Sequence, residues 1–352
     1  MPSTTQAAET AGDLVFQVND ATVSFDVERG VSRVLDSVSI NIYENEILGI
    51  VGESGSGKSM FASALLDAVV EPGVLTGEIL YQPADSEPVD LVEASDRQIR
   101  TIRWEQIAMV FQGAMSSFNP TSTIEKHFRE TLRDHDRDVV AGMERADDIL
   151  TDLYLDPERM LSSYPHELSG GMQQRALIAL SLILEPNVLV MDEPTAALDL
   201  LMQRAILSMI ADIKEKYDLT VVFITHDLPL IAKLADRLAV MYAFDFVEVG
   251  TAREMVFEPA HPYTRALLNS TPNLEAHLDQ MRPIEGNSPD PVDSIQGCSY
   301  NPRCPLADSE CESLDPPFET VSSTHRTACH HWRQTDEKIP LNTKMATRED
   351  QG

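Results

Sequence analysis

The segment that most constrains how this chain folds is ILGIVGESGSGKS, residues 47–59, which places a Gly-rich turn after an apolar run. ILGIV (47–51) is wholly apolar, as expected of a strand buried in a parallel sheet. SMFASALLDAV (59–69) follows the turn with helical spacing. The turn, GESGSGKS (52–59), fits the pattern of Gly, any four residues and Gly-Lys-Ser. Strand, turn and helix together predict a P-loop that binds a nucleoside triphosphate.

Each part of this loop has a predicted role. Backbone N–H groups surround the phosphates, and the helix N-terminus adds partial positive charge. Lys58 is expected to reach the β- and γ-phosphates, and the Ser59 hydroxyl to ligate Mg²⁺. The predicted ATP-binding residues of the loop are Gly52, Glu53, Ser54, Gly55, Ser56, Gly57, Lys58 and Ser59.

A second motif, NVLVMDEP (187–194), brings two carboxylates to the end of another apolar strand. Asp192 is expected to hold the Mg²⁺ shell. Glu193 follows it and can accept a hydrogen bond from an attacking water. A strand that ends in Asp-Glu is weak evidence by itself, but together with the P-loop it predicts a nucleoside triphosphatase.

A third motif, LSGGM (168–172), stands before a helical pattern. Ser169, Gly170 and Gly171 would form a second helix N-terminus able to hold a phosphate. One active site does not need two such ends. We therefore predict two cassettes arranged head to tail, in which these residues complete the partner's ATP site in trans. The alternative interpretation is a Gly-rich helix cap.

The pattern along the chain predicts an α/β fold. Residues 13–50 alternate apolar and polar side chains, which indicates a β-rich, partly antiparallel start. Residues 95–185 are predicted to be mainly helical, with a loop around 113–120. LTVVFITHD (219–227) is a further apolar strand, and LAVMYAFDFVEVG (238–250) is typical of a closing hairpin. Strands that alternate with helices indicate a parallel sheet.

The composition changes after Pro259, where Pro, Asn, Asp and Cys replace the periodic pattern. We therefore place a boundary near residue 258. The predicted regions are a disordered tail (1–12), an ATPase domain (13–258), a C-terminal extension (259–335) and a flexible tail (336–352).

With these motifs the sequence resembles the ATP-binding-cassette (ABC) ATPases over about residues 13–258, and LSGGM is the most specific match. The resemblance implies a P-loop NTPase fold with an antiparallel β subdomain and a helical signature subdomain. It implies that Gln112, in VFQ, contacts Mg²⁺ and water and couples to membrane subunits. Asp199, in AALD, would cross the dimer interface, and His226, in ITHD, would contact the γ-phosphate. Phe25 is a candidate for stacking on adenine, and core packing would suit it equally.

Three segments resemble the peptide-importer branch of that family: GESGSGKS, SSFNP (116–120) and HPYTRALL (261–268). This branch takes up dipeptides, oligopeptides and sometimes nickel or other solutes. Asn45 stands where the family usually has Gly, and Phe118 where it has Leu. Both positions lie outside the nucleotide chemistry, so these departures bear on the substrate more than on the ATPase.

All four cysteines lie near the C-terminus, at Cys298, Cys304, Cys311 and Cys329, with five, six and seventeen residues between them. This spacing matches neither the common zinc nor the ferredoxin patterns. The residues alone therefore leave zinc, an iron–sulfur cluster and unliganded thiols open. The peptide-importer resemblance implies a [4Fe–4S] cluster on all four, with Zn²⁺ as the alternative, in a small metal-stapled extension. The neighbouring histidines, His325, His330 and His331, are expected to be surface residues.

The net charge of −30 comes from 57 acidic and 27 basic residues, with the acids spread along the chain. This balance argues against nonspecific binding of nucleic acid, which needs a basic surface. It favours a cytoplasm of very high salt, where charge repulsion is screened; an acidic mesophilic protein is the alternative. The N-terminus lacks the pattern of a signal peptide, and no apolar run approaches the roughly 18 residues that span a bilayer. We expect a peripheral protein on the cytoplasmic face of the cell membrane.

The sequence thus predicts the ATP-hydrolysing subunit of an ABC importer. Its expected partners are a second ABC ATPase subunit, giving a heterodimer, two transmembrane permease subunits and an extracellular solute-binding protein. No nucleic acid is expected. Two alternatives remain: a soluble cassette that acts on ribosomes or DNA, and a regulatory subunit whose C-terminal cluster senses metal or redox state.

Overall fold

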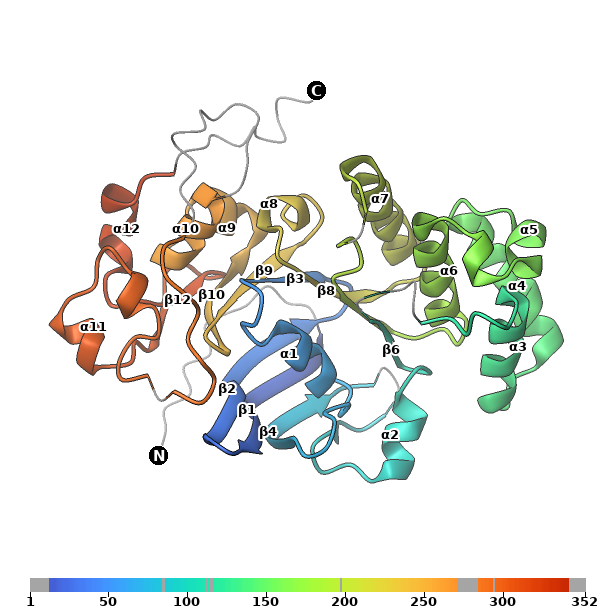
Figure 1. Ribbon diagram of the computed structural model, residues 1–352, viewed down its shortest axis with the longest axis horizontal. Coiled ribbons are helices and arrows are strands. Elements are labelled where there is room, and N and C mark those ends of the chain that lie inside the picture. Colours follow the sequence, from blue (N-terminus) through green and yellow to red (C-terminus); the bar gives the residue numbers. More distant parts are fainter. Residues whose placement is uncertain are drawn as a thin grey trace.

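The computed structural model describes residues 13–83, 86–111, 113, 117–196, 198–270, 284–293 and 295–341. Two sheets form the centre of this part of the chain (Figure 1). A four-stranded antiparallel sheet has the order β2-β1-β4-β5. Its strands are β1 (Leu14–Val27), β2 (Gly30–Tyr43), β4 (Val74–Tyr81) and β5 (Val89–Asp90). The predicted antiparallel start is confirmed, whereas neither β4 nor β5 follows from the sequence pattern.

The larger sheet has eight strands in the order β11-β12-β10-β9-β3-β8-β7-β6. The five strands from β9 to β6 are parallel, and the four from β9 to β11 are antiparallel. The strands of this sheet are β3 (Ile47–Val51), β6 (Ile107–Val110), β7 (Val188–Asp192), β8 (Thr220–Thr225), β9 (Arg237–Tyr242), β10 (Asp245–Thr251), β11 (Phe318–Thr320) and β12 (Arg326–Ala328).

The apolar runs of the sequence became the centre of this sheet. β3, β7 and β8 are buried along their whole length, as predicted for parallel strands. β6 is a strand inside the region predicted to be mainly helical, so that prediction is wrong for Ile107–Val110. The run is four residues long, and periodicity alone does not separate so short a buried strand from a helix.

Helices cover the sheets and form a separate lobe beside β6 (Figure 1). In that lobe Ile124, Phe128 and Leu132 repeat every four residues along α3, so one face is apolar and packs into the core. The helices are α1 (Lys58–Ala64), α2 (Asp96–Ile102), α3 (Ile124–Asp134), α4 (Val139–Asp152), α5 (Pro157–Ser162), α6 (Gly170–Leu182), α7 (Leu200–Lys216), α8 (Leu228–Ile231), α9 (Ala252–Phe257), α10 (Pro262–Ser270), α11 (Ser309–Ser313) and α12 (Trp332–Lys338).

The C-terminal extension is part of the larger sheet. β12 pairs antiparallel with β10, and β11 pairs with β12, so the sheet continues past the boundary proposed near residue 258. The low periodicity after Pro259 did not predict these strands or the helices α10 to α12. Tyr263, Cys298 and Tyr300 belong to the same hydrophobic core as the central strands. The extension therefore shares the core of the cassette.

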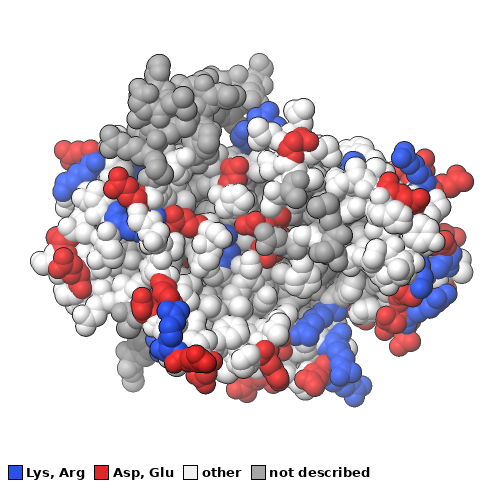
Figure 2. Space-filling view, viewed as in Figure 1, with Lys and Arg blue, Asp and Glu red and all other residues white. Residues whose placement is uncertain are grey.

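On the face shown in Figure 2, acidic side chains lie around the rim over several elements and do not form one block. This agrees with the spread of the 57 acidic residues along the sequence. No helix in the described part of the chain is both long and apolar enough to cross a membrane.

Candidate functional site

Three neighbouring parallel strands end at one edge of the sheet, and the predicted nucleotide residues follow each of them. The P-loop follows β3, Glu193 follows β7 and His226 follows β8. Because β8 lies between β3 and β7, these segments meet at the carboxyl edge of the sheet. This edge is where open α/β sheets bind their ligands.

Glycines allow the P-loop to take its shape. Gly57 caps α1 with φ of 109°, and a Cβ there would lie 2.7 Å from the carbonyl oxygen of Val34. A Cβ on Gly52 would collide with the main-chain oxygen of Met241, since β9 runs beside β3. Phe244, in the turn after β9, donates its N–H to the carbonyl oxygen of Ser56 at 3.1 Å. The β9–β10 turn therefore supports the loop from outside.

Lys58 is buried inside its own loop, with 5% of its surface exposed. Its Nζ donates to the carbonyl oxygens of Gly52 at 2.9 Å and Glu53 at 2.7 Å. Burial lowers the pKa of Lys58, while the carboxylates of Glu193 and Asp192 act in the opposite direction. The Lys58 ammonium group is thus bound by carbonyl oxygens of its own loop, and phosphate oxygens could replace these acceptors.

Asp192 offers a fit for Mg²⁺. The residue is 4% exposed, its side chain is hydrogen-bonded with Ser59, and burial raises the pKa of its carboxyl. Its Oδ1 atom is buried and has no hydrogen-bond partner among the described residues. A buried oxygen without a partner is costly unless it binds a cation or water. Ser59 and Asp192 therefore fit the pair of oxygen ligands predicted for Mg²⁺.

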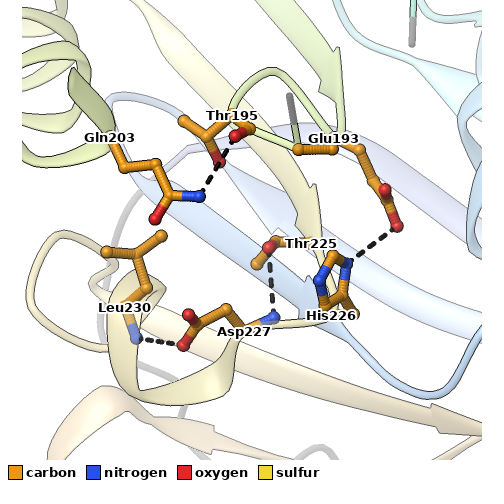
Figure 3. A pocket seen from close by; sticks show the side chains of 8 residues that line it. Glu193, Thr195, Gln203, Thr225, His226, Asp227 and Leu230 are labelled. Atoms are coloured by element: carbon orange, nitrogen blue, oxygen red, sulfur yellow. Dashed lines mark hydrogen bonds and ion pairs between the residues drawn. The ribbon is translucent and has the colours of Figure 1, made fainter. Parts of the chain in front are cut away.

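Glu193 and His226 point toward each other at this edge (Figure 3), with Glu193 Oε1 3.2 Å from His226 Nδ1. Glu193 has φ of 46°, in the left-handed region that non-glycine residues seldom occupy. Its N–H donates to the carbonyl oxygen of Ile224 at 3.0 Å, which ties this backbone to β8. Such strain gathers at functional sites. The structure thus brings the two residues together, as the predicted γ-phosphate chemistry requires.

A small cavity of about 40 Å³ is lined by Glu193 and His226 together with residues that follow β7, residues at the end of β8, and Gln203 of α7. Gln203 Nε2 donates to Thr195 O at 3.1 Å, and Asp227 N donates to Thr225 Oγ1 at 3.1 Å. Asp227 in turn caps α8 by accepting from Leu230 N (Figure 3). These bonds fix the segments that carry Glu193 and His226.

The residues of the LSGGM motif (168–172) lie in the helical lobe, apart from the P-loop of the same chain (Figure 1). Ser169 caps α6 by accepting from Met172 N at 3.4 Å, and Gly170 and Gly171 form the first turn. Asp199 caps α7 by accepting from the N–H groups of Leu201 and Met202. The helix-cap interpretation of LSGGM holds within one chain, Asp199 is a helix cap as well, and the predicted roles of these residues in trans remain predictions.

Two predicted residues stand apart from this cluster. Gln112 lies outside the described residues. Phe25, on β1, is half-buried against the core of the antiparallel sheet, and its ring lies against Gly73. Packing in the core and stacking on adenine both remain compatible with this position.

Contacts that sequence reasoning missed bind the P-loop to the C-terminal extension. Glu53 N donates to the Tyr263 hydroxyl at 2.9 Å, and the Glu53 carboxylate accepts from Arg303 and Ser288. Arg303 is 250 positions from Glu53 along the chain, and no spacing rule joins the two. The one signal in the sequence is HPYTRALL itself, which contains Tyr263 and resembles the peptide importers but has no role in the nucleotide motifs.

The four cysteines come from four places in the C-terminal extension. Cys298 and Cys304 flank the 3-10 turn Asn301–Arg303, Cys311 lies in α11, and Cys329 follows β12. Cys298 N donates to Cys311 O at 2.8 Å. Burial raises the pKa of Cys298 and Cys304 to about 11 and of Cys329 to about 12, and the nearby thiols add to this. The fold thus gathers all four thiols in one region.

The spacing of those sulfur atoms is wider than a single zinc ion needs. Four thiolates on one tetrahedral zinc lie about 3.8 Å apart, given Zn–S bonds near ~2.3 Å. Among the described residues, the group of three potential ligand atoms within 4.8 Å of one another is Asp308, Cys311 and His331, and it contains one cysteine. In the part of the chain that the structure describes, no three of the cysteine sulfur atoms therefore lie as close together as the ligands of one zinc ion would.

His325 is not a surface residue, which corrects the expectation from sequence. It is 2% exposed, and its Nε2 lies 2.7 Å from Oε1 of Glu248, which is fully buried on β10. Glu248 also accepts from Ala260 N. His330 and His331 are half-buried. This buried pair joins the extension to the cassette. Loss of either partner would leave a buried polar group without its partner, which is costly.

The fold and this edge of the sheet define a nucleotide-hydrolysing cassette. A family model described as "ABC transporter" matches residues 35–196, and one described as "Oligopeptide/dipeptide transporter, C-terminal region" matches residues 247–311. A dimeric bacterial ABC transporter cassette of known structure has a TM-score of 0.59 and 27% identity to this chain. It covers 68% of this chain and 99% of its own. A post-hydrolysis state of the same cassette, bound to ADP and phosphate, gives the same TM-score and coverage at 26% identity.

Named relatives align with this chain over most of its length. The dipeptide transport ATP-binding protein of Caldanaerobacter subterraneus is 37% identical over 324 residues, 91% of this chain and 98% of the relative. The corresponding protein of Escherichia coli is 35% identical over 90% of this chain and 96% of its own length. The oligopeptide transport ATP-binding protein of Bacillus subtilis is 38% identical over 88% and 87%. The chain belongs to the ATP-binding subunits of ABC transporters, and it is an ATPase.

Proposed function

We propose that this chain hydrolyses ATP to drive the uptake of peptides or a related solute through a membrane transporter. The observation that carries the proposal is the peptide-transporter C-terminal region matched at residues 247–311, directly behind a cassette matched at 35–196. The named relatives are ATP-binding proteins of dipeptide and oligopeptide transport. The particular solute depends on other subunits.

Within the cassette, the proposed roles follow from the contacts. Phosphate oxygens would replace the carbonyl partners of Lys58, and Ser59 and Asp192 would hold Mg²⁺. Gln112 would join them as a ligand, on the family resemblance alone. When bound, the cation neutralises charge that develops on the phosphates. Glu193 would take the proton of the attacking water. His226, which lies in contact with Glu193, would contact the γ-phosphate.

The partners form part of the proposal. Ser169, Gly170, Gly171 and Asp199 would complete the site of a second cassette, in a heterodimer that closes on ATP and reopens after hydrolysis. Two permease subunits and an extracellular solute-binding protein would complete the importer, with this chain peripheral on the cytoplasmic face. Nucleic acid is not a proposed partner, given the net charge of −30.

Purification of the tagged chain from its own membranes tests this function. We expect two permease subunits and a second cassette to co-purify. Recovery of ribosomal proteins or nucleic acid in their place would support the soluble cassette that acts on ribosomes or DNA. Recovery of the chain with a regulator and without permeases would support a metal- or redox-sensing subunit.

We also propose that Cys298, Cys304, Cys311 and Cys329 hold a [4Fe–4S] cluster, with Zn²⁺ as the alternative. The convergence of four thiols and their wide spacing support the larger group. When bound, such a cluster supplies iron–thiolate bonds that tie the turn Asn301–Arg303, α11 and the end of β12 together.

Protein purified without oxygen is expected to absorb visible light and to contain iron and sulfide in equal amounts. Cys329→Ser should lose this absorbance because it removes one ligand, whereas Ser313→Ala, on the exposed end of α11, should keep it. Colourless protein with one zinc per chain would reject the cluster.

The acidic surface supports one more proposal, that the protein works in a high-salt cytoplasm. Since salt screens like charges, the temperature of unfolding is expected to rise as potassium chloride increases from about 0.1 to about 3 M. A temperature that stays level or falls over this range would favour an ordinary acidic protein.

A further inference from the structure

Glu53 is held from three sides by the C-terminal extension. Arg303 donates two hydrogen bonds to its carboxylate, from Nη1 to Oε2 at 2.6 Å and from Nη2 to Oε1 at 2.9 Å. Ser288 Oγ donates to Oε2 at 3.1 Å. The main-chain N–H of Glu53 donates to the Tyr263 hydroxyl at 2.9 Å. Both the side chain and the backbone of this P-loop residue are therefore fixed by residues far along the chain.

Arg303 is itself tightly placed. Its side chain is 5% exposed, and its Nε donates to Glu285 O at 2.8 Å. Its guanidinium lies 5.6 Å from the centre of the Tyr242 ring, which packs against Tyr263 in a tilted arrangement with centroids 4.5 Å apart. A planar guanidinium with two parallel bonds to a carboxylate fixes direction as well as charge. Arg303 is thus built to orient Glu53.

The main chain of Glu53 leads directly to the phosphate-binding lysine. The carbonyl oxygen of Glu53 accepts from Lys58 Nζ at 2.7 Å, while its N–H is bound to Tyr263. A shift of this residue would therefore move a contact of Lys58. If Arg303 were lost, the Glu53 carboxylate would keep its hydrogen bond from Ser288 but lose its positive partner, and its charge would repel the negative charge of ATP.

We infer that Arg303 and Tyr263 are positioning residues for the P-loop. They hold Glu53 so that the loop keeps the shape that binds ATP, and Arg303 neutralises the negative charge of the Glu53 carboxylate. This inference rests on the proposed nucleotide site. It makes ATP affinity depend on the cysteine-bearing segment, since Arg303 lies between Cys298 and Cys304. Another part of the extension reaches the antiparallel sheet, where Arg33 N on β2 donates to Pro291 O at 2.8 Å.

The test compares Arg303→Gln, Glu53→Gln and the double variant in the full-length chain, with ATP as the probe. Arg303→Gln is expected to weaken ATP binding and raise KM about tenfold, with kcat within about twofold, because it leaves a carboxylate unpaired beside the phosphates. Glu53→Gln alone is expected to have a smaller effect. The double variant should bind ATP better than Arg303→Gln does, since no unpaired charge remains.

Tyr263→Phe gives a second measurement that keeps the aromatic ring in the core. It removes the acceptor of the Glu53 N–H and is expected to raise KM about threefold. The matched control is Arg333→Gln, an exposed arginine of the same extension, which should leave KM unchanged.

Two results would overturn the inference: Arg303→Gln and Tyr263→Phe with the KM of the native protein, or a double variant no better than Arg303→Gln. The second result would mean that Arg303 acts through general stability. If the assignment of the nucleotide site were itself wrong, the result would differ, because Lys58→Ala would then bind ATP with native affinity.

Discussion

Glu193→Gln is expected to bind ATP with native affinity and to hydrolyse it about 10²–10⁴-fold more slowly. Glutamine matches the shape of glutamate and can still meet His226, but it cannot take a proton from the attacking water. The measurement is a pair of assays on one preparation: equilibrium binding of ATP, and steady-state release of phosphate. Native turnover in this variant would remove Glu193 as the general base.

Glu185→Gln is the matched control for this experiment. Glu185 also has a left-handed backbone, with φ of 61° against 46° for Glu193. It lies just after the end of α6. Its side chain pairs with Arg145 and is 66% exposed. Turnover should stay native there, which separates the chemistry at Glu193 from the backbone strain that the two residues share.

Lys58→Ala is expected to lower ATP affinity about 100-fold, because the loop loses the cation that faces the phosphates. Calorimetric titration of ATP with the full-length chain measures this loss directly. Lys216→Ala is the control, since that lysine pairs with Asp152 on the surface, and its loss should leave affinity unchanged.

Stability must be followed in parallel for Lys58→Ala. The side chain is buried and hydrogen-bonded to the loop carbonyls of Gly52 and Glu53, so its removal leaves those acceptors without a partner. A folded variant with native ATP affinity would contradict the assignment of the P-loop.

Local pattern was enough to predict the centre of the fold. β3, β7 and β8 are apolar runs bounded by Gly, Asp or His, so their type and place could be predicted. The nucleotide residues follow these strands directly, and neighbouring parallel strands bring their ends together. Asn45 shows the same local logic: it stands where the resembling family has Gly and has φ of 56°, which Asn tolerates better than most residues.

What could not be predicted depends on contacts between distant segments. β6 is too short for periodicity to reveal, and β11 and β12 are three residues each. Their strand state comes from pairing with neighbours, which local pattern does not encode. The same holds for His325, which was expected at the surface and is buried because Glu248 of β10 binds it. The bond between Glu53 and Arg303 likewise depends on the tertiary fold alone.

The pairing of β12 with β10 has a consequence for anyone who would shorten this protein. A chain cut near residue 258 would keep every nucleotide motif but would strip the partner from Glu248 and Val249 of β10. The uncovered N–H and C=O groups would form an open strand, a template for joining one copy to the next. In the intact chain the sheet instead ends at the three-residue β11, too short an edge to recruit a neighbour. The extension therefore covers the edge of β10 that a shortened chain would expose.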